Sequence, residues 1–220
     1  MTKSPKIQHM KKAIVLFVTV CFAHLYTSAQ ISAVTSKGDE VTLYTNGTWK
    51  YTNKVDTAIE ITTNKTPFKK PATATFDVKS NITPEVTIAI NPKKWDFKKS
   101  DAGAASEFNF DLKAKDAYGM IITERIQIPL LTLKEVALKN ARGVSPDMEV
   151  VKNEYRTVNG RKMLYMEMEG SIEGVELTYF CYYYSYDSGS IQFLTYTSKQ
   201  LAKEYKADME DLLNGLVVTK

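Results

Sequence analysis

The stretch from Val175 to Tyr186, VELTYFCYYYSY, constrains the fold more than any other part of the chain. In an extended strand alternate side chains point to opposite faces, and here both sets are largely apolar or aromatic. Such a strand belongs in the middle of a sheet that is covered on both sides. The sequence therefore predicts a central strand whose tyrosines are mainly core residues. Tyr184 and Tyr186, next to the predicted turn at Asp187, remain candidates for contact with a partner.

Short β-patterned runs separated by turn residues flank this strand, and two segments change to helical spacing. A capping box from Thr132 to Glu135 opens the first predicted helix, and Ser198 can cap the second. Together these elements predict an α+β domain over residues 82–220, which is long enough to bury one sizeable core. The other predicted strands are 86–90, a strand at Trp95, 107–115, 118–128, 148–155, 161–169 and 190–197, and the two helices end at Gly143 and Leu216.

The N-terminus has the three-part pattern of a secretory signal peptide. Four lysines precede an apolar run from Ala13 to Tyr26, and the small-residue site Thr27-Ser28-Ala29 follows it. The apolar run is shorter than the roughly 20 residues that a membrane helix needs. Residues 1–29 are therefore predicted to be cleaved off before Gln30. The mature chain is then exported to the periplasm or the extracellular space, without an integral membrane span.

Removing this segment changes the composition in ways that exclude several functions. Both histidines, His9 and His24, lie in it, which excludes a histidine base, a histidine-activated nucleophile and any histidine-ligated metal in the mature chain. The segment also takes four of the 29 Lys and Arg residues and no acid, which leaves 25 basic and 25 acidic residues. A chain without net charge has no global attraction to nucleic acid. One cysteine, Cys181, remains, so no internal disulfide can form.

Residues 30–53 predict a small β-hairpin module. Asn46-Gly47 stands between two runs of β-branched and aromatic residues, which is a strong signal for a hairpin turn. A unit of this size is too small to be stable alone, so it is expected to dock on the main domain or on a partner. Tyr44, Trp49 and Tyr51 are its candidate partner-binding residues.

Residues 54–81 are rich in Thr, Lys, Ala and Pro and show little apolar periodicity, which predicts a solvated linker. Within it, Asp56-Thr57-Ala58 resembles the acceptor pattern of an O-glycosylation system of some Gram-negative bacteria. Thr57 is therefore a candidate modification site, and an unmodified linker is the alternative.

The pattern from about residue 84 to 217 resembles the PsbP/Mog1-like (DcrB/PsbP-type) family. The features that carry the resemblance are the strand at Trp95, the hairpin VNGRKMLYMEMEG at Val158 to Gly170, the tyrosine-rich strand at 175–186, the strand IQFLTYT and the closing helix KEYKADMEDLLNGL. The resemblance implies an antiparallel sheet packed between helices, and a role as an accessory or binding protein rather than an enzyme.

The sequence has no phosphate-binding loop, Gly-rich dinucleotide turn or cysteine cluster, so no cofactor or metal is predicted. Cys181 stands among aromatic residues without a nearby cation, which favours an inert buried thiol. The preferred hypothesis is a non-catalytic binding module of the cell envelope with a protein or glycan partner, and self-association remains open. The alternative is a hydrolase built on Glu124, Glu167 and Glu169, which requires a pocket where two carboxylates converge about 5 to 10 Å apart.

Overall fold

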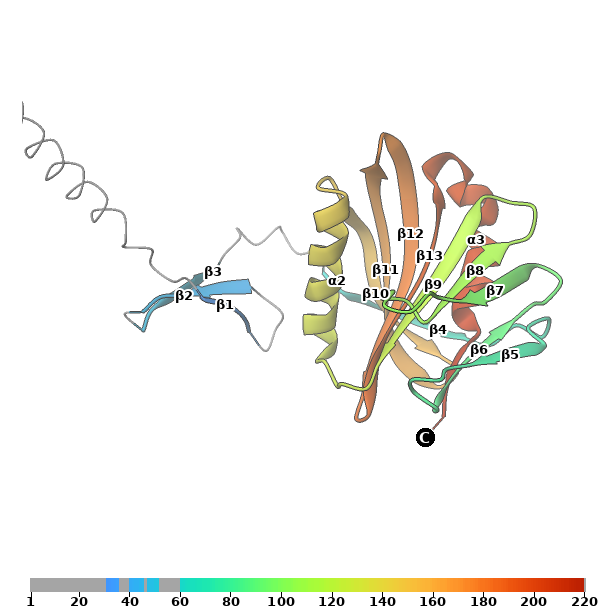
Figure 1. Ribbon diagram of the computed structural model, residues 1–220, viewed down its shortest axis with the longest axis horizontal. Coiled ribbons are helices and arrows are strands. Elements are labelled where there is room, and N and C mark those ends of the chain that lie inside the picture. Colours follow the sequence, from blue (N-terminus) through green and yellow to red (C-terminus); the bar gives the residue numbers. More distant parts are fainter. Residues whose placement is uncertain (1–30, 36–39, 46, 52–59, 220) are drawn as a thin grey trace, which may run out of the picture. The chain divides into compact units, whose positions relative to one another are not determined.

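A computed structural model describes residues 31–35, 40–45, 47–51 and 60–219. The described strands fall into two compact units, one built on the first three strands and one that contains all the remaining elements (Figure 1). The predicted signal peptide and Thr57 lie outside the described residues.

The N-terminal unit is a three-stranded sheet in the order β1-β2-β3. Strands β2 and β3 pair antiparallel, which confirms the predicted hairpin. Gly47 has a φ of 79°, a conformation that suits glycine at a tight turn. The tyrosine before the turn, Tyr44, accepts a hydrogen bond from the backbone N–H of Gly47 at 3.0 Å. The strands are β1 Ile31–Val34, β2 Glu40–Leu43 and β3 Trp49–Tyr51.

The larger unit contains an eight-stranded sheet in the order β4-β10-β11-β12-β13-β9-β8-β7. Every pairing is antiparallel except that of β4 with β10, which is parallel. The sheet is therefore mixed, and the prediction of a purely antiparallel sheet is wrong at this edge. The strands are β4 Thr62–Phe68, β7 Trp95–Lys99, β8 Phe108–Leu112, β9 Ala117–Glu124, β10 Glu149–Val158, β11 Arg161–Ile172, β12 Val175–Tyr186 and β13 Gly189–Ser198.

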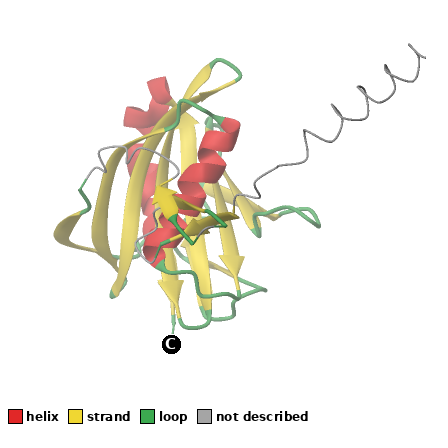
Figure 2. Ribbon diagram, turned by 90° about the vertical axis from the view of Figure 1, so that its left-hand side faces the viewer, coloured by secondary structure: helices red, strands yellow, loops and turns green. Residues whose placement is uncertain are grey.

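Strand β12 lies in the middle of this sheet, between β11 and β13, as its two apolar faces predict. Phe180 and Tyr182 point to one face, where they pack with the helix α3, Lys199–Asn214. Cys181 and Tyr183 point to the other face, where they pack with the helix α2, Leu130–Val144. Figures 1 and 2 show the twisted sheet with both helices packed against it.

Both helices differ from their predicted bounds. Helix α2 begins directly after Pro129, whose backbone is extended with φ −50° and ψ 135°, and no side chain caps it. The predicted capping box at Thr132 is therefore wrong, because the chain is already helical there. Helix α3 begins after Ser198, as predicted, although the Ser198 side chain accepts no capping hydrogen bond from the first turn. It ends at Asn214, and Leu216 belongs to a strand instead.

That strand completes a second sheet of three strands, β14-β6-β5. Its apolar residues join the core on the α3 side of the large sheet, so this core is enclosed by two sheets and a helix. The turn into β14 needs glycine, because a side chain at Gly215 would overlap the carbonyl oxygen of Ala89. The strands are β5 Phe76–Lys79, β6 Val86–Ile90 and β14 Leu216–Val218.

Part of the predicted linker is structured, which corrects the prediction of solvated chain over 54–81. Residues 62–68 form β4 and residues 76–79 form β5. Most side chains of β4 are exposed, because this edge strand is held mainly by backbone pairing with β10. A polar edge strand has no apolar alternation for a sequence pattern to detect.

The turn between β10 and β11 is the predicted Asn159-Gly160 turn, with φ values of 48° and 82°. The Asn159 side chain also fastens neighbouring segments. Its amide nitrogen donates to the carbonyl oxygens of Asn214 and Leu216 at 2.9 and 2.8 Å, and its amide oxygen accepts from the backbone N–H of Lys70 at 2.7 Å. One side chain therefore fixes the end of α3 and the chain after β4.

Candidate functional site

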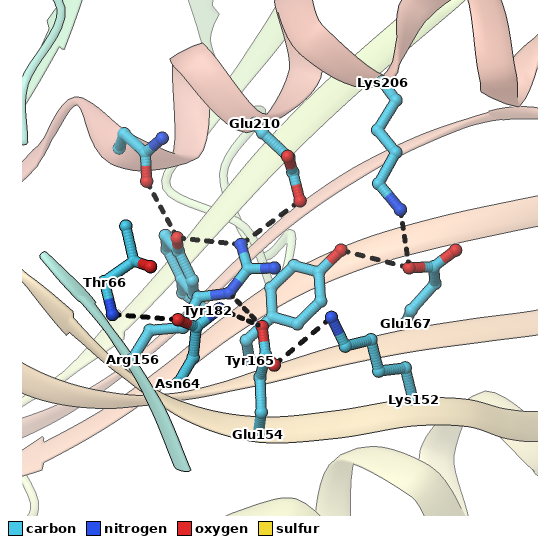
Figure 3. A network of polar contacts seen from close by, with 11 residues as sticks. Asn64, Thr66, Lys152, Glu154, Arg156, Tyr165, Glu167, Tyr182, Lys206 and Glu210 are labelled. Atoms are coloured by element: carbon cyan, nitrogen blue, oxygen red, sulfur yellow. Dashed lines mark hydrogen bonds and ion pairs between the residues drawn. The ribbon is translucent and has the colours of Figure 1, made fainter. Parts of the chain in front are cut away.

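Arg156 on β10 lies buried on the α3 side of the large sheet, at the centre of a polar network (Figure 3). Its Nε donates to Glu154 Oε1 at 2.7 Å, and its Nη1 donates to Glu210 Oε1 at 3.2 Å. The same Nη1 lies 3.4 Å from the hydroxyl of Tyr182, which donates to Asn214 Oδ1 at 2.8 Å. One guanidinium therefore links β10, β12 and α3.

Aromatic rings surround the charged part of the network. The Arg156 Cζ lies 3.4 Å from the ring centroid of Tyr165 and 4.5 Å from that of Phe68, a cation–π arrangement. The Tyr165 hydroxyl donates to Glu167 Oε2 at 3.3 Å, and Lys206 from α3 donates to the same oxygen at 2.9 Å. The network thus has two parts: Arg156 pairs with Glu154 and Glu210 in one, and Lys206 pairs with Glu167 in the other.

Within the network, the pKa shifts of Arg156 and Glu154 favour the charged forms of these two groups. Burial lowers the pKa of Arg156, but its interactions with Tyr182 and Glu154 outweigh burial and raise it overall. Burial raises the pKa of Glu154, but hydrogen bonds from Arg156, Asn64 and Lys152 lower it overall. Burial raises the pKa of Tyr182 to about 12. An ionic network in which the charges are paired in this way fixes the positions of β10, β12 and α3 relative to one another, and it offers no free acid or base for catalysis.

The three glutamates of the hydrolase hypothesis do not share one place. Glu167 and Glu169 project toward the α3 side, where Lys206 and Lys199 neutralise them at 2.9 and 2.8 Å. Glu124 projects from β9 toward the opposite face. The structure therefore brings two of the three to one face, each of them already paired with a lysine.

A small hollow lies beside Trp95 instead, and none of those glutamates lines it. Its polar residues include Lys94, which forms an ion pair with Asp208 of α3, and Asp211. Burial raises the pKa of Asp211. Lys94 already supplies the positive charge next to these acids. Across the described residues, no three His, Cys, Asp or Glu side chains gather in a way that could hold a metal ion.

The predicted pair Tyr184 and Tyr186 lies on the α3 side of β12. Their rings stack with centroids 5.6 Å apart, and both are half-buried against the core. Cys181 is completely buried on the opposite side, and burial raises the pKa of its thiol to about 12. A thiol with that pKa stays protonated at neutral pH and is a poor nucleophile.

In the N-terminal unit, Trp49 has 51% of its surface exposed, and Tyr44 is half-buried. Tyr51 pairs through its backbone with Val41, and its side chain lies outside the described residues. Trp49 stands opposite Leu43, which is also exposed, so these two give the small sheet an apolar surface. Whether these residues bind a partner stays a prediction.

The structure reveals a further aromatic surface, which we call the tyrosine ladder: Tyr118 on β9, Tyr196 on β13 and Tyr179 on β12. The three residues stand directly opposite one another across neighbouring strands. Tyr118 and Tyr196 have ring centroids 5.5 Å apart, and Tyr196 and Tyr179 have centroids 5.4 Å apart. Their side chains lie on the α2 face, but α2 packs over β11 and β12. Tyr118 therefore remains 36% exposed.

In its middle the ladder presents hydroxyl groups and ring edges rather than ring faces. Tyr196 stacks on Tyr179 and lies at a tilt of 32° against Tyr118, so the faces between these rings are occupied and only the outer rings can have a free face. Burial raises the pKa of Tyr179 to about 12, and burial also raises the pKa of Tyr196. The hydroxyls of Tyr179 and Tyr196 are therefore neutral hydrogen-bond donors and acceptors at physiological pH.

Sequence reasoning missed the ladder. Tyr118 and Tyr196 are single tyrosines in separate strands, 78 positions apart, so no local motif joins them. Only the pairing register of β9 with β13 and of β13 with β12 brings the three rings together. The sequence did show which face of its own strand each tyrosine takes, because alternate residues point to opposite faces. That information locates the ladder only when the strand order is known.

The larger unit has a PsbP-like fold. The PsbP protein of the cyanobacterium Synechocystis sp. PCC 6803 (CyanoP) aligns over 66% of this chain and 92% of its own length, with a TM-score of 0.50 and 12% sequence identity. This likeness concerns the fold alone. No protein-family model matches the chain, and no curated protein matches its sequence.

Two other solved structures show weaker similarity. LpqN of Mycobacterium tuberculosis is described as involved in cell envelope biogenesis. It aligns over 66% of this chain and 90% of its own length, with a TM-score of 0.47 and 15% sequence identity. PA94 of Pseudomonas aeruginosa, a protein of unknown function, aligns over 66% of this chain and 97% of its own length, with a TM-score of 0.43 and 13% sequence identity. Neither similarity is strong enough to carry an argument. Among the described residues, no helix is long and apolar enough to span a membrane.

Proposed function

We propose that this chain is an exported, non-catalytic binding module of the bacterial cell envelope. In this proposal the sheet sandwiched between α2 and α3 is a rigid scaffold, and the tyrosine ladder is its contact surface. The observation that carries the proposal is the partly exposed ladder, with Tyr118 as its exposed end, on the part of the sheet that α2 leaves uncovered. A row of tyrosines combines apolar contact through the rings with hydrogen bonding through the hydroxyls, as protein interfaces commonly do.

The geometry in the middle of the ladder, at Tyr196, favours a protein partner over a glycan. Binding of a sugar by aromatic residues commonly needs an open ring face, whereas Tyr196 has a ring on each side. Trp49 in the N-terminal unit, with 51% of its surface exposed, offers a second candidate surface. The two surfaces can be tested separately, because they lie in different units.

Three features support a non-catalytic role. Glu167 and Glu169 are each paired with a lysine. The Cys181 thiol is buried and stays protonated. The acids beside the hollow already have Lys94 as their cation. A hydrolase needs an activated nucleophile and a free base, and none of these residues is a good candidate for either role.

The export part of the proposal rests on the N-terminal sequence pattern. We expect the protein recovered from the periplasmic or extracellular fraction to begin at Gln30. Edman sequencing or intact mass measurement checks this expectation, and a recovered chain that retains residues 1–29 would contradict cleavage at that site.

Site-specific photo-crosslinking tests the contact surface. Benzoylphenylalanine is placed at Tyr118, at Trp49 and, as a control, at Tyr155 on β10, and the proteins are irradiated in an envelope fraction. We expect a discrete crosslinked protein from position 118 and none from position 155. Mass spectrometry then identifies the crosslinked species and the peptide joined to it.

Other outcomes of this experiment have definite meanings. A crosslink from position 49 alone would move the binding surface to the N-terminal sheet. A crosslink to a second copy of the chain would identify the ladder as a self-association surface. Failure to crosslink at both positions would contradict the binding module and restore the hydrolase alternative.

A further inference from the structure

The tyrosine ladder continues toward the edge of the sheet as a row of acidic residues. Asp111 on β8 stands directly opposite Tyr118, and Asp96 on the edge strand β7 stands directly opposite Asp111. Residues that pair directly across antiparallel strands share a face. The row across β13, β9, β8 and β7 therefore reads tyrosine, tyrosine, aspartate, aspartate on the uncovered side of the sheet.

Of the two aspartates, only Asp96 has an ion pair among the described residues. Asp96 has an exposed ion pair with Lys113 at 3.1 Å. Asp111 is half-buried, and no ion pair of its carboxylate is found within the described residues. Its charge is close enough to the ladder to contribute to the raised pKa of Tyr196, after burial and the charge of Tyr118. Like charges directly opposite one another destabilise a sheet, so a further cation here would relieve their repulsion.

The open face of Tyr118 adds a second attraction for a cation. One face of its ring is covered by Tyr196, so its other face is directed toward β8, where Asp111 stands. A guanidinium or ammonium group over that face would gain a cation–π interaction and would lie next to the carboxylate. Arginine suits this position best, because its planar group both stacks on rings and pairs with carboxylates.

We propose that Tyr118, Asp111 and Asp96 form a docking site for an arginine or lysine side chain of a protein partner. This inference rests on the proposed function, and it specifies the chemistry of the partner at the end of the ladder. The charge complementarity selects a basic segment over an acidic or neutral one.

The test measures binding of synthetic peptides to the mature chain by fluorescence anisotropy. The probe is a labelled peptide of alternating Gly and Arg, and matched peptides carry Glu or Gln in place of Arg. We expect the Arg peptide to bind, and its Kd to rise about tenfold in Asp96→Asn/Asp111→Asn. In Tyr118→Ala we expect a rise of about threefold, because the cation–π contact is lost.

The control variant is Asp77→Asn/Asp187→Asn, which removes two exposed aspartates elsewhere and gives the same net charge. We expect its Kd for the Arg peptide to stay within about twofold of wild type, since distant surface charges are screened by salt. An equal loss in the control would reduce the binding to nonspecific attraction and overturn the docking site. Circular dichroism of each variant confirms that it folds.

The peptides also separate this inference from the proposed function. Binding of the Glu or Gln peptide that is as tight as that of the Arg peptide and depends on Tyr118 would overturn the basic chemistry but keep the ladder as a binding surface. Binding that ignores Tyr118 and both aspartates would overturn the docking site, while crosslinking from position 118 still decides whether the ladder contacts a protein.

Discussion

Tyr182 and Tyr183, neighbours on β12 that point to opposite faces of the large sheet, differ in how their hydroxyls are paired. On the α3 face, the buried Arg156 joins two carboxylates, and the Tyr182 hydroxyl has partners on both sides. On the α2 face, the next residue along the strand, Tyr183, is completely buried, and its hydroxyl has no hydrogen-bond partner among the described residues. Burial, together with the Cys181 thiol, raises its pKa well above the usual value.

This difference suggests separate roles for the two faces: one fixes the packing of the fold, and the other offers a surface for binding. A buried network in which every member is satisfied has one good arrangement, so the α3 face fixes how the helix and the second sheet meet the large sheet. The α2 face relies on apolar packing near the helix and leaves the tyrosine ladder partly open beyond it. We therefore expect substitutions on the α3 face to affect stability most, and substitutions in the ladder to affect binding.

The largest effect is expected from Arg156→Met. Removing the guanidinium takes the Arg156 ion pair away from Glu210 and leaves the buried Glu154 with only its partly exposed partner Lys152, so we expect a loss of about 3–5 kcal/mol in unfolding free energy. Urea denaturation followed by circular dichroism measures it. The double variant Arg156→Met/Glu154→Met is the control, and it should lose less than the single variant. A loss below about 1 kcal/mol in the single variant would contradict the importance of the network.

A matched pair of tyrosine variants tests the comparison directly. Tyr182→Phe loses the hydrogen bond to Asn214, so we expect a destabilisation of about 1–2 kcal/mol. Tyr183→Phe removes a hydroxyl that is buried without a partner, so we expect no loss or a gain of up to about 1 kcal/mol. Both values come from the same denaturation experiment. Equal destabilisation of the two variants would show that the faces do not differ in this respect.

A smaller effect should appear in the dependence of stability on pH. The pKa of Glu154 lies below its usual value of 4.5 in the folded chain, so the unfolded chain takes up the proton more readily. The contribution of this group is present above pH 4.5 and is lost as the pH falls through the folded pKa. We expect Glu154→Gln to show a shallower loss of stability with acid than wild type.

The control for this titration is Asp147→Asn. Hydrogen bonds from Ser171 and Ser145 hold the pKa of Asp147 well below its usual range, so this group acts with the same sign. Its substitution should reduce the acid dependence independently of Glu154. If Glu154→Gln keeps the full slope of wild type, the carboxylate does not contribute through ionisation.

The smallest effect on stability is expected from Tyr118→Ser in the ladder. Tyr118 is among the exposed large residues, and surface substitutions usually change unfolding free energy within about 0.5 kcal/mol. We expect a slightly larger loss of up to about 1 kcal/mol, because the contact with Tyr196 disappears. Thermal unfolding measures it. A loss above about 3 kcal/mol would show that the ladder is part of the core.

Much of the fold could be predicted from the sequence, because the hydrophobic pattern is strong where strands are buried. The central position of β12, the strands from β6 to β11 and the hairpin with the Asn159-Gly160 turn all follow from alternation and turn residues. Strand β4 could not be predicted, because it is polar and is held mainly by backbone pairing. The start of α2 was misplaced, because Pro129 fixes the helix start without a side-chain cap.

The candidate site was less predictable than the fold. Arg156 and Glu210 are 54 positions apart, and the tyrosines of the ladder come from three strands. Charged residues two positions apart on a strand, such as Glu154 and Arg156, were indistinguishable from a solvated face until α3 was known to cover them. Local patterns predict which face a residue takes, whereas the pairing register decides which residues meet.

The Asn159 turn has a further consequence for the chemical lifetime of the chain. Asn-Gly sequences lose ammonia spontaneously when the following backbone nitrogen attacks the side-chain amide. That attack needs an amide that can rotate, whereas the Asn159 amide is held by Asn214, Leu216 and Lys70. Folding therefore protects the turn from ageing. If the end of α3 detaches, the Asn159 amide is released and can deamidate, which converts this residue to an aspartate or isoaspartate with a negative charge.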